Sequence, residues 1–330
     1  MLRALVIELP ASVRNLYFAC YNPLILLGIQ RRRIGCQPVL RKPKRSITVS
    51  MSHPHSSAAN LPEPSVTPIQ GLHCGHYFYR WKREVLSSIG KAAVHEAKAD
   101  FSAAIAPHST ARPERIQSFI VSGHKADFAT IMMDPDPLRI DRVHQRIMSS
   151  ALGAAIEPVY SFVSMSEISE YLPSKEQYAA KLIRTGEDPQ SPTYQAKVAS
   201  YEKRIPMMHA QRLAPEFPNW PAMCFYPMNK VRNVGANWFL ESFSARTEMM
   251  AEHAQSGMAF AGRVTQLVTA SVGLDDWEWG VTLWARNPQF LKDIVYTMRF
   301  DSASARFGQF GTFYTGYLAT GPAILDHCMV

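Results

Sequence analysis

An order of secondary-structure elements that occurs twice is the feature that most constrains the fold of this chain. From residue 71 onwards the hydrophobic pattern predicts a strand, a helix, two strands joined by a tight turn, a helix and a strand, and the same order returns from residue 222. A β-α-β-β-α-β unit is a ferredoxin-like half. We therefore expect an α+β fold built from two similar halves. Their sheets would pack back to back or join in one α/β barrel, with a cavity on the second half.

The elements of the first half follow from alternating apolar residues and from turn residues. Strands are predicted at 74–83, 118–122, 127–133 and 157–166, and helices at 84–105 and 137–151. The tight turn falls at Gly123-His124-Lys125, where glycine supplies the necessary backbone freedom.

The second half is predicted in the same way, after a polar, proline-bearing segment with one or two surface helices. Its strands are expected at 222–228, 264–271, 277–285 and 309–318, and its helices at 244–261 and 287–298. Ser244 is the expected N-cap of the first helix, and Pro288 suits the start of the second. The predicted divisions are an extension at 1–68, a first half at 69–166, a connecting segment at 167–221 and a second half at 222–330.

The basic charge of the chain is confined to its N-terminal extension. Residues 1–50 contain nine basic side chains and only Glu8 as an acid, so the remaining residues carry 26 basic and 26 acidic groups. The globular part gives no reason to expect a nucleic-acid partner. The extension is a disordered tail, an organellar transit peptide, or a segment that is not made because translation starts at Met51; we favour the first and third interpretations. The expected location is therefore cytoplasmic, and organellar only if residues 1–50 are a genuine transit peptide.

The cysteines and the hydropathy pattern exclude two further classes of protein. The five cysteines are scattered and never form a CxxC pair, which argues against a disulfide framework or a zinc site and favours a reducing compartment. The longest apolar run, at 16–29, is too short for a bilayer span and is interrupted by Asn22 and Pro23. We expect no membrane span.

Three residues of the second half could carry chemistry together. Tyr226 lies near the end of a strand, Lys230 follows four residues later, and His253 lies on a helix face between Met250, Gly257 and Phe260. Alone, a histidine in such a place is more often a core or surface residue than a ligand. Gly257 fits either close helix packing or a flat macrocycle lying against the helix.

Several segments around these residues match a known family in order and with hardly a gap. They are YPMNKVRNVGANWFL (226–240), VTQLVTASVGLDDWEWGVTLWA (264–285) and VYTMRFDSASARFGQFGTFYTG (295–316), together with the helix that carries His253. The chain closely resembles the C-terminal half of the coproheme decarboxylases, which belong to the chlorite dismutase-like family of haem proteins. The resemblance covers residues 71–318, weakly before Pro221 and strongly after it. It implies two ferredoxin-like halves forming a dimeric α/β barrel, and a homopentamer.

The resemblance assigns roles at a haem-like substrate, iron coproporphyrin III. It makes His253 the axial iron ligand. It makes Gln266 the distal residue, where chlorite-degrading enzymes have an arginine, so chlorite chemistry is not expected. Charge-assisted hydrogen bonds would hold the propionates. The residues expected at the substrate are Arg212, Tyr226, Pro227, Met228, Asn229, Lys230, Gln266, Trp279, Arg299 and Ser304. For Arg299, an interaction with the end of its own helix is the alternative.

The reaction implied by the resemblance is hydrogen peroxide-dependent oxidative decarboxylation of two propionates, which converts coproheme to haem b. Coproheme would be both substrate and redox cofactor. Tyr226 would form a tyrosyl radical that takes a hydrogen atom from a propionate, Lys230 would dock the reacting propionate or relay a proton, and Trp279 would carry an electron in the second round. This is the final step of coproporphyrin-dependent haem biosynthesis, so transient contact with a coproporphyrin ferrochelatase is expected.

Two other functions remain open at this point. A non-catalytic haem-binding or haem-sensing protein would need His253 but neither Tyr226 nor Lys230, and a peroxidase-like member of the family would act on haem b. The chain departs from the family pattern at Val231, Ala254 and Met258. These departures affect packing and charge near the expected pocket rather than the iron ligand.

Overall fold

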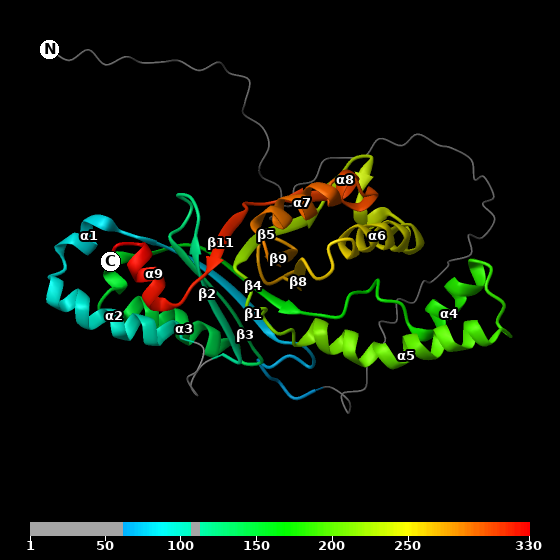
Figure 1. The fold of residues 1–330 in the computed structure, drawn as a ribbon, viewed down its shortest axis with the longest axis horizontal. Helices are drawn as coiled ribbons and strands as arrows, with labels where there is room; N and C mark the ends of the chain where they lie inside the picture. The colour runs from blue at the N-terminus through cyan, green and yellow to red at the C-terminus, as the bar shows by residue number, and fades with distance from the viewer. Residues whose placement is uncertain (1–61, 107–112) are drawn as a thin grey trace, which may run out of the picture. The chain divides into compact units, whose positions relative to one another are not determined.

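The computed structural model describes residues 62–106 and 113–330 (Figure 1). The chain divides into units at 1–61 and 62–330, and the described residues all belong to the second. The interpretations of residues 1–50 and of Met51 therefore lie outside the described residues. In the described ranges, no helix has the length and apolar character required to cross a membrane.

One large antiparallel sheet organises the described residues, and its strand pairings return to their starting point. Its strands are β1 (His73–Trp81), β2 (Arg115–Val121), β3 (Phe128–Asp134), β4 (Ile156–Ser166), β5 (Ala222–Lys230), β8 (Val264–Ala270), β9 (Trp279–Ala285), β10 (Gly308–Phe310) and β11 (Tyr314–Leu318). Their order is β10-β5-β11-β2-β3-β1-β4-β8-β9, and β9 also pairs with β5. The halves are thus joined by β2–β11 and β4–β8 pairing. A separate hairpin of β6 (Arg232–Asn233) and β7 (Ala236–Asn237) follows β5.

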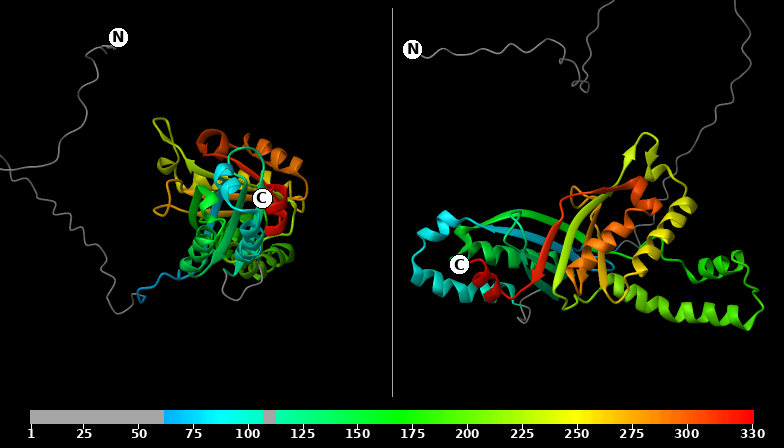
Figure 2. Two further views of the ribbon diagram at one scale, coloured as in Figure 1. Left: turned by 90° about the vertical axis from the view of Figure 1, so that its left-hand side faces the viewer. Right: turned by 45° about the horizontal axis from the view of Figure 1, so that its top comes forward.

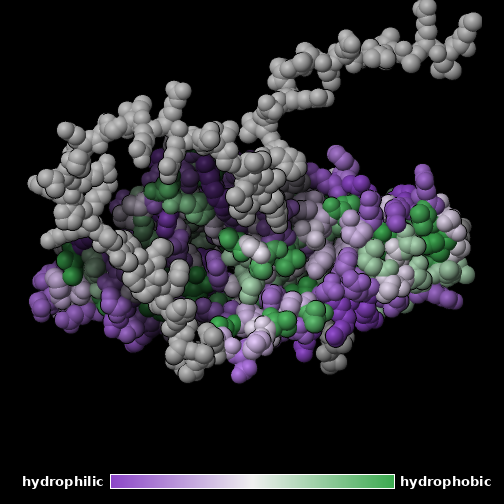
Figure 3. Space-filling view, turned by 180° about the vertical axis from the view of Figure 1, so that it is seen from behind, coloured by the Kyte–Doolittle hydropathy of each residue, from purple (hydrophilic) through white to green (hydrophobic). Residues whose placement is uncertain are grey.

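The helices and the sheet confirm the predicted α+β class. The helices are α1 (Arg83–Ser88), α2 (Lys91–Ile105), α3 (Pro137–Ser149), α4 (Lys175–Arg184), α5 (Pro192–Leu213), α6 (Phe243–Met258), α7 (Pro288–Met298), α8 (Ser302–Phe307) and α9 (Gly321–His327), with short 3-10 turns at Gly153–Ala155 and Trp238–Leu240. Where the sequence predicted one or two surface helices in the connecting segment, the structure has α4 and α5, which form a hairpin extending away from the sheet (Figure 2). Seen from behind, the surface combines hydrophilic residues with hydrophobic ones, which are visible near the middle of this face and toward the end where α1 and α2 lie (Figure 3).

Several predicted boundaries differ from the structure for local reasons. The single helix expected at 84–105 is divided into α1 and α2, because Ile89 has extended backbone angles and Gly90, the N-cap of α2, is also non-helical. Ser242 rather than Ser244 caps α6, since the Ser242 hydroxyl accepts the Ala245 amide. The strand expected at 309–318 is interrupted by a loop at 311–313 between β10 and β11.

The two faces of the second half's strands contact different partners. One face shares a core with the first half, in which Phe78 and Phe162 pack with Phe225 and Trp284. The other face, which includes Tyr226, packs against α7 (Figure 1). Residues directly opposite each other on antiparallel strands project to the same face. The register therefore places Gln266 and Trp279 on the same face as Tyr226.

Candidate functional site

The ring of His253 is held by a buried carboxylate. His253 lies on α6, and its Nδ1 is 2.9 Å from Oδ2 of Asp301, which is fully buried. The Ser304 hydroxyl donates to the same carboxylate oxygen at 3.2 Å and lies 3.3 Å from His253 Nδ1. All hydrogen bonds from described residues to the ring therefore involve Nδ1. Since a carboxylate accepts, Nδ1 carries the proton and Nε2 presents a lone pair, the arrangement usual for a metal-binding histidine.

Asp301 also begins the helix that follows it. Its other oxygen, Oδ1, accepts the Ser304 amide at 2.8 Å and so caps α8. The position of the Asp301 carboxylate is therefore fixed, because the group that orients the imidazole also caps the start of α8. The pattern Asp-Ser-Ala-Ser predicts a helix cap, but it contains no signal for a histidine 48 residues earlier.

Tyr226 is a buried phenol in an aromatic environment. Its side chain lies on β5, and its ring stacks on Phe313 with centroids 4.4 Å apart and planes inclined by 23°. Phe310 lies 5.7 Å away, with the Arg299 guanidinium 4.1 Å above the Phe310 ring. Burial raises the pKa of Tyr226, while the charge of Arg299 acts in the opposite direction. The phenol is therefore protonated at neutral pH and is poorly suited to general-base chemistry.

Lys230 reaches the same short helix as the His253 ring. Its Nζ donates to the Ala303 carbonyl at 3.2 Å and lies 4.5 Å from the centroid of Trp238. Burial lowers the pKa of Lys230 to about 8, and the charge of Asp301 opposes that shift. The ammonium thus contributes a positive charge close to the Asp301 carboxylate.

Glu278 fixes the end of the strand that carries Tyr226 and Lys230. Its backbone amide donates to Asn229 Oδ1 at 2.7 Å, and its carboxylate accepts the Lys230 amide at 3.1 Å. Arg232 forms an ion pair with the same carboxylate. Asn229 therefore has a structural role in addition to the substrate contact that was predicted for it.

The other predicted substrate residues lie in different surroundings. Gln266 is exposed on β8, and Trp279 is half-buried opposite Met228 on β9. The Pro227 carbonyl accepts the Gly311 amide at 2.8 Å. Arg212 is exposed in the last turn of α5, and among the described residues no hydrogen bond or ion pair joins it to the His253 cluster.

The predicted helix face around His253 is only partly correct. A Cβ at Gly257 would lie 2.9 Å from Cε of Met298, so this glycine faces α7 at close range. This contact favours close helix packing over a macrocycle as the reason for the glycine. Phe260 lies beyond the end of α6 and packs in the same core cluster as Tyr226.

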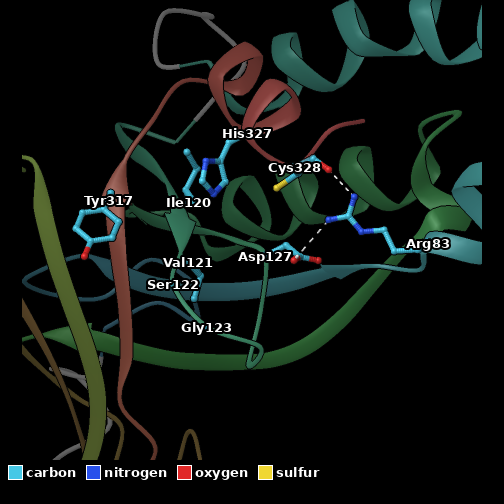
Figure 4. Close-up of a pocket in the computed structure, with 9 residues that line it drawn as sticks. All are labelled: Arg83, Ile120, Val121, Ser122, Gly123, Asp127, Tyr317, His327 and Cys328. Atoms are coloured by element: carbon cyan, nitrogen blue, oxygen red, sulfur yellow. Dashed lines mark hydrogen bonds and ion pairs between the residues drawn. The ribbon is translucent and has the colours of Figure 1, made fainter.

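Two described pockets lie away from these residues. One, of about 290 Å³, lies between the β2–β3 turn and α9, where Arg83 bonds to the Cys328 carbonyl and pairs with Asp127 (Figure 4). The other, of about 450 Å³, lies between α2 and α9. Neither is lined by a predicted site residue, and the cavity expected on the second half stays a prediction.

Four residues that contact the predicted site were not identified from the sequence. They are Trp238, Glu278, Asp301 and Phe313. Glu278, Asp301 and Phe313 are distant in sequence from the residues that they contact, whereas Trp238 lies near Lys230 in sequence and reaches it through the turn of the β6–β7 hairpin.

Comparison with known proteins places this geometry in a family context. A family model described as chlorite dismutase matches residues 92–319, which is more than half of the chain. The coproheme decarboxylase of Staphylococcus carnosus is 38% identical over 198 residues, covering 60% of this chain and 70% of that protein. A haem-binding protein from Thermus thermophilus superposes with a TM-score of 0.64 at 29% identity, covering 82% of this chain and 99% of that structure. A mutant chlorite dismutase from Candidatus Nitrospira defluvii has a TM-score of 0.59 at 14% identity, covering 79% and 97% of the two chains, and supports the fold alone.

Proposed function

The chain belongs to the chlorite dismutase family, as the resemblance predicted, and we propose that it decarboxylates coproheme to haem b with hydrogen peroxide as oxidant. The observation that carries this proposal is the His253–Asp301 pair, which leaves Nε2 available to an iron ion while Tyr226 and Lys230 are buried in the same half. The 38% sequence identity with a coproheme decarboxylase supports the choice of coproheme as substrate.

The residues of the chain would divide the work as follows. Bound coproheme supplies the iron for the peroxide chemistry, so the substrate is its own redox cofactor. His253 binds the iron, and Asp301 orients the imidazole. Tyr226 loses an electron and its phenolic proton, and the resulting radical takes a hydrogen atom from a propionate. The resulting carbon radical would give a second electron to the substrate iron that peroxide has oxidised, and it would lose carbon dioxide to leave a vinyl group. For each propionate, one peroxide thus accepts two electrons and two protons, one proton from the substrate by way of Tyr226 and one from solvent, and gives two waters.

The remaining site residues would bind the substrate's edge. Lys230 would dock the reacting propionate or pass a proton to it, and Trp279 would serve the second round. Gln266 would lie on the distal side without the positive charge that chlorite chemistry needs. The other proposed contacts are Arg212, Pro227, Met228, Asn229, Arg299 and Ser304.

The proposal extends to the assembly and setting of the protein. The circuit of pairings between β5 and β9 supports a dimeric α/β barrel made of ferredoxin-like halves at 69–166 and 222–330, joined by 167–221. We further propose a cytoplasmic homopentamer that receives coproheme through transient contact with a ferrochelatase.

A non-catalytic haem-binding protein is the second candidate, favoured by the similarity to the Thermus haem-binding protein. Such a protein would use His253 and Asp301 in the same way. It would bind the porphyrin and leave every propionate intact, so the porphyrin product separates the two candidates.

Mass spectrometry of the porphyrin tests the proposed function. The purified protein is loaded with iron coproporphyrin III and titrated with hydrogen peroxide, beside Tyr226→Phe and the exposed control Tyr296→Phe. We expect a three-propionate intermediate and then haem b from the wild type and from the control, and neither product from Tyr226→Phe. Bleaching without loss of carbon dioxide in the wild type would overturn the proposal in favour of the haem-binding protein.

A further inference from the structure

We propose that Phe313 and Lys125 are positioning residues for Tyr226, so that a turn of the first half holds the reactive ring of the second. We call Phe313 and Lys125 together the clamp. The role of the clamp in catalysis rests on the proposed function, whereas its effect on the orientation of the Tyr226 ring does not. Phe313 lies in the loop at 311–313, and Lys125 lies in the β2–β3 turn.

Ring packing rather than hydrogen bonding orients Tyr226. Among the described residues no hydrogen bond reaches its phenol, although the side chain is only 6% exposed. The stacked Phe313 ring, 4.4 Å away, therefore limits rotation about the Tyr226 side chain. Phe310 makes a second, tilted contact at 5.7 Å. Movement of Phe313 would free the ring on its stacked face.

The loop that carries Phe313 is pressed against β5. The Gly311 amide donates to the Pro227 carbonyl at 2.8 Å. A Cβ at Gly311 would lie 2.7 Å from Pro227 Cγ and 2.9 Å from Trp277 Cζ2, so a larger residue would displace the loop. This close approach lies at the first residue of the loop at 311–313, where the strand expected at 309–318 is interrupted.

Lys125 fastens the other end of this loop from the first half. Its Nζ donates to the Phe313 carbonyl at 2.7 Å. The turn is itself held, because Arg80 donates to the carbonyls of His124 and Lys125 at 3.1 and 3.2 Å, and the Ser122 amide donates to the Thr315 carbonyl at 2.8 Å. Figure 1 shows β2 and β11 side by side, consistent with their pairing. The Tyr226 ring is thus constrained through residues on both sides of Phe313.

A positioning role has a distinct consequence for the reaction. Hydrogen-atom transfer from a propionate depends on the placement of the phenol, and a displacement of about 1 Å is enough to slow a reaction about 100-fold. Substrate affinity depends instead on the iron ligand and the propionate contacts. Loss of the clamp should therefore reduce the rate at saturating coproheme and leave the dissociation constant of coproheme unchanged.

Fluorine NMR of the full-length protein without porphyrin tests the clamp itself. With 3-fluorotyrosine at position 226, we expect ring flipping to become about tenfold faster in Phe313→Leu, which removes one aromatic stacking interaction. We expect faster flipping also in Lys125→Met, which removes the hydrogen bond that holds the Phe313 carbonyl. Lys125→Arg keeps a donor and should restore the slow rate. Phe290→Leu is the matched control, because Phe290 packs against the same cluster but its ring is not among the aromatic rings that contact Tyr226, which are those of Phe310 and Phe313. Unchanged flipping in both Phe313→Leu and Lys125→Met would overturn the proposal.

Kinetics of the same variants separate the clamp from the proposed function. Coproheme turnover by Phe313→Leu and Lys125→Met should fall by about tenfold or more at saturating substrate, with the coproheme dissociation constant within about twofold of the wild type. If the wild type makes no haem b while the NMR result holds, the proposed function fails and the clamp stands. If the variants flip faster but decarboxylate at the wild-type rate, the positioning role in catalysis is refuted.

Discussion

At the scale of single residues, Asp301 tests the assignment of His253 as an iron ligand. Asp301→Asn keeps a good helix cap but replaces the accepting carboxylate by a neutral amide. We expect coproheme affinity to fall about 10- to 100-fold and the iron–histidine stretching frequency to drop, because the imidazole loses its orienting, basicity-raising partner. Absorption titration and resonance Raman spectroscopy measure the two effects. Asp293→Asn, next to Lys292, serves as the control. Equal spectra and affinities in both variants would contradict the assignment.

Lys230 should make the stability of the free protein depend on alkaline pH. Burial lowers its pKa from 10.5 to about 8, so between these values the unfolded chain binds a proton that the folded chain does not. The free energy of unfolding should then rise with pH over this window, by at most about 1.4 kcal/mol per unit. Urea unfolding at pH 7.5 to 10 should show a shallower rise in Lys230→Met than in the wild type or in the exposed control Lys292→Met. Parallel curves for all three proteins would show that Lys230 keeps its ordinary pKa.

The sequence could predict single residues where the evidence lies in one short segment, but not where it depends on a contact between segments far apart in the chain. Tyr226, Lys230 and His253 belong to short segments that resemble a family, so the sequence alone was enough to propose them as site residues. The partners of His253 and Tyr226 come from other elements and make their contacts only after folding. Arg299 is a residue for which the sequence left two roles open. It does end α7, yet its side chain lies over Phe310, beside Tyr226.

At the scale of elements, the packing of α6 against α7 can be tested at Gly257. An added methyl group would press on Cε of Met298, the mobile end of a flexible side chain, while alanine favours the helix by about 1 kcal/mol over glycine. Gly257→Ala should therefore leave stability unchanged or raise it by up to about 1 kcal/mol in urea unfolding. Reduced coproheme affinity with unimpaired stability would instead indicate that the macrocycle lies against this helix.

Gly280→Ala is the contrasting substitution for that experiment. Its Cβ would lie 2.4 Å from Cε1 of Phe162, a fully buried ring of the first half that has little room to move. Overpacking of this kind typically costs about 1–3 kcal/mol, so Gly280→Ala should be less stable than the wild type.

The types of the secondary-structure elements were predictable because the periodicity of apolar residues is a local signal. The divisions of elements at Gly90 and at 311–313 were not predicted. The division at 311–313 depends on the residues that the loop packs against, which the local periodicity does not show.

At the scale of the whole molecule, the two halves depend on one another. The core containing Phe78, Phe162, Phe225 and Trp284 draws on both halves, and β2–β11 and β4–β8 pairing crosses between them. The repeated order of elements predicted each half from its own sequence. It left open whether the sheets pack back to back or join, because pairing between strands so far apart in sequence leaves no periodic signal. Several polar contacts cross this shared region, and one of them involves a buried histidine. His76 Nε2 is 2.8 Å from the Thr282 hydroxyl, and the His76 ring stacks on Phe225.

This buried histidine should make the joined halves sensitive to acid. Burial lowers the pKa of His76 from 6.5 to about 3, so between these pH values the unfolded chain binds a proton at His76 that the folded chain does not bind. Stability should therefore fall as pH decreases through this window, by up to about 1.4 kcal/mol per unit from His76 alone. His76→Gln retains hydrogen-bonding capacity without the titration, and its unfolding free energy should fall less between pH 7 and pH 5 than that of the wild type. His95→Gln, at an exposed position, should behave as the wild type does. If His76→Gln lost stability as steeply as the wild type, acid lability would have to arise at other groups, and the contact between the halves would remain neutral packing without a role in the pH response.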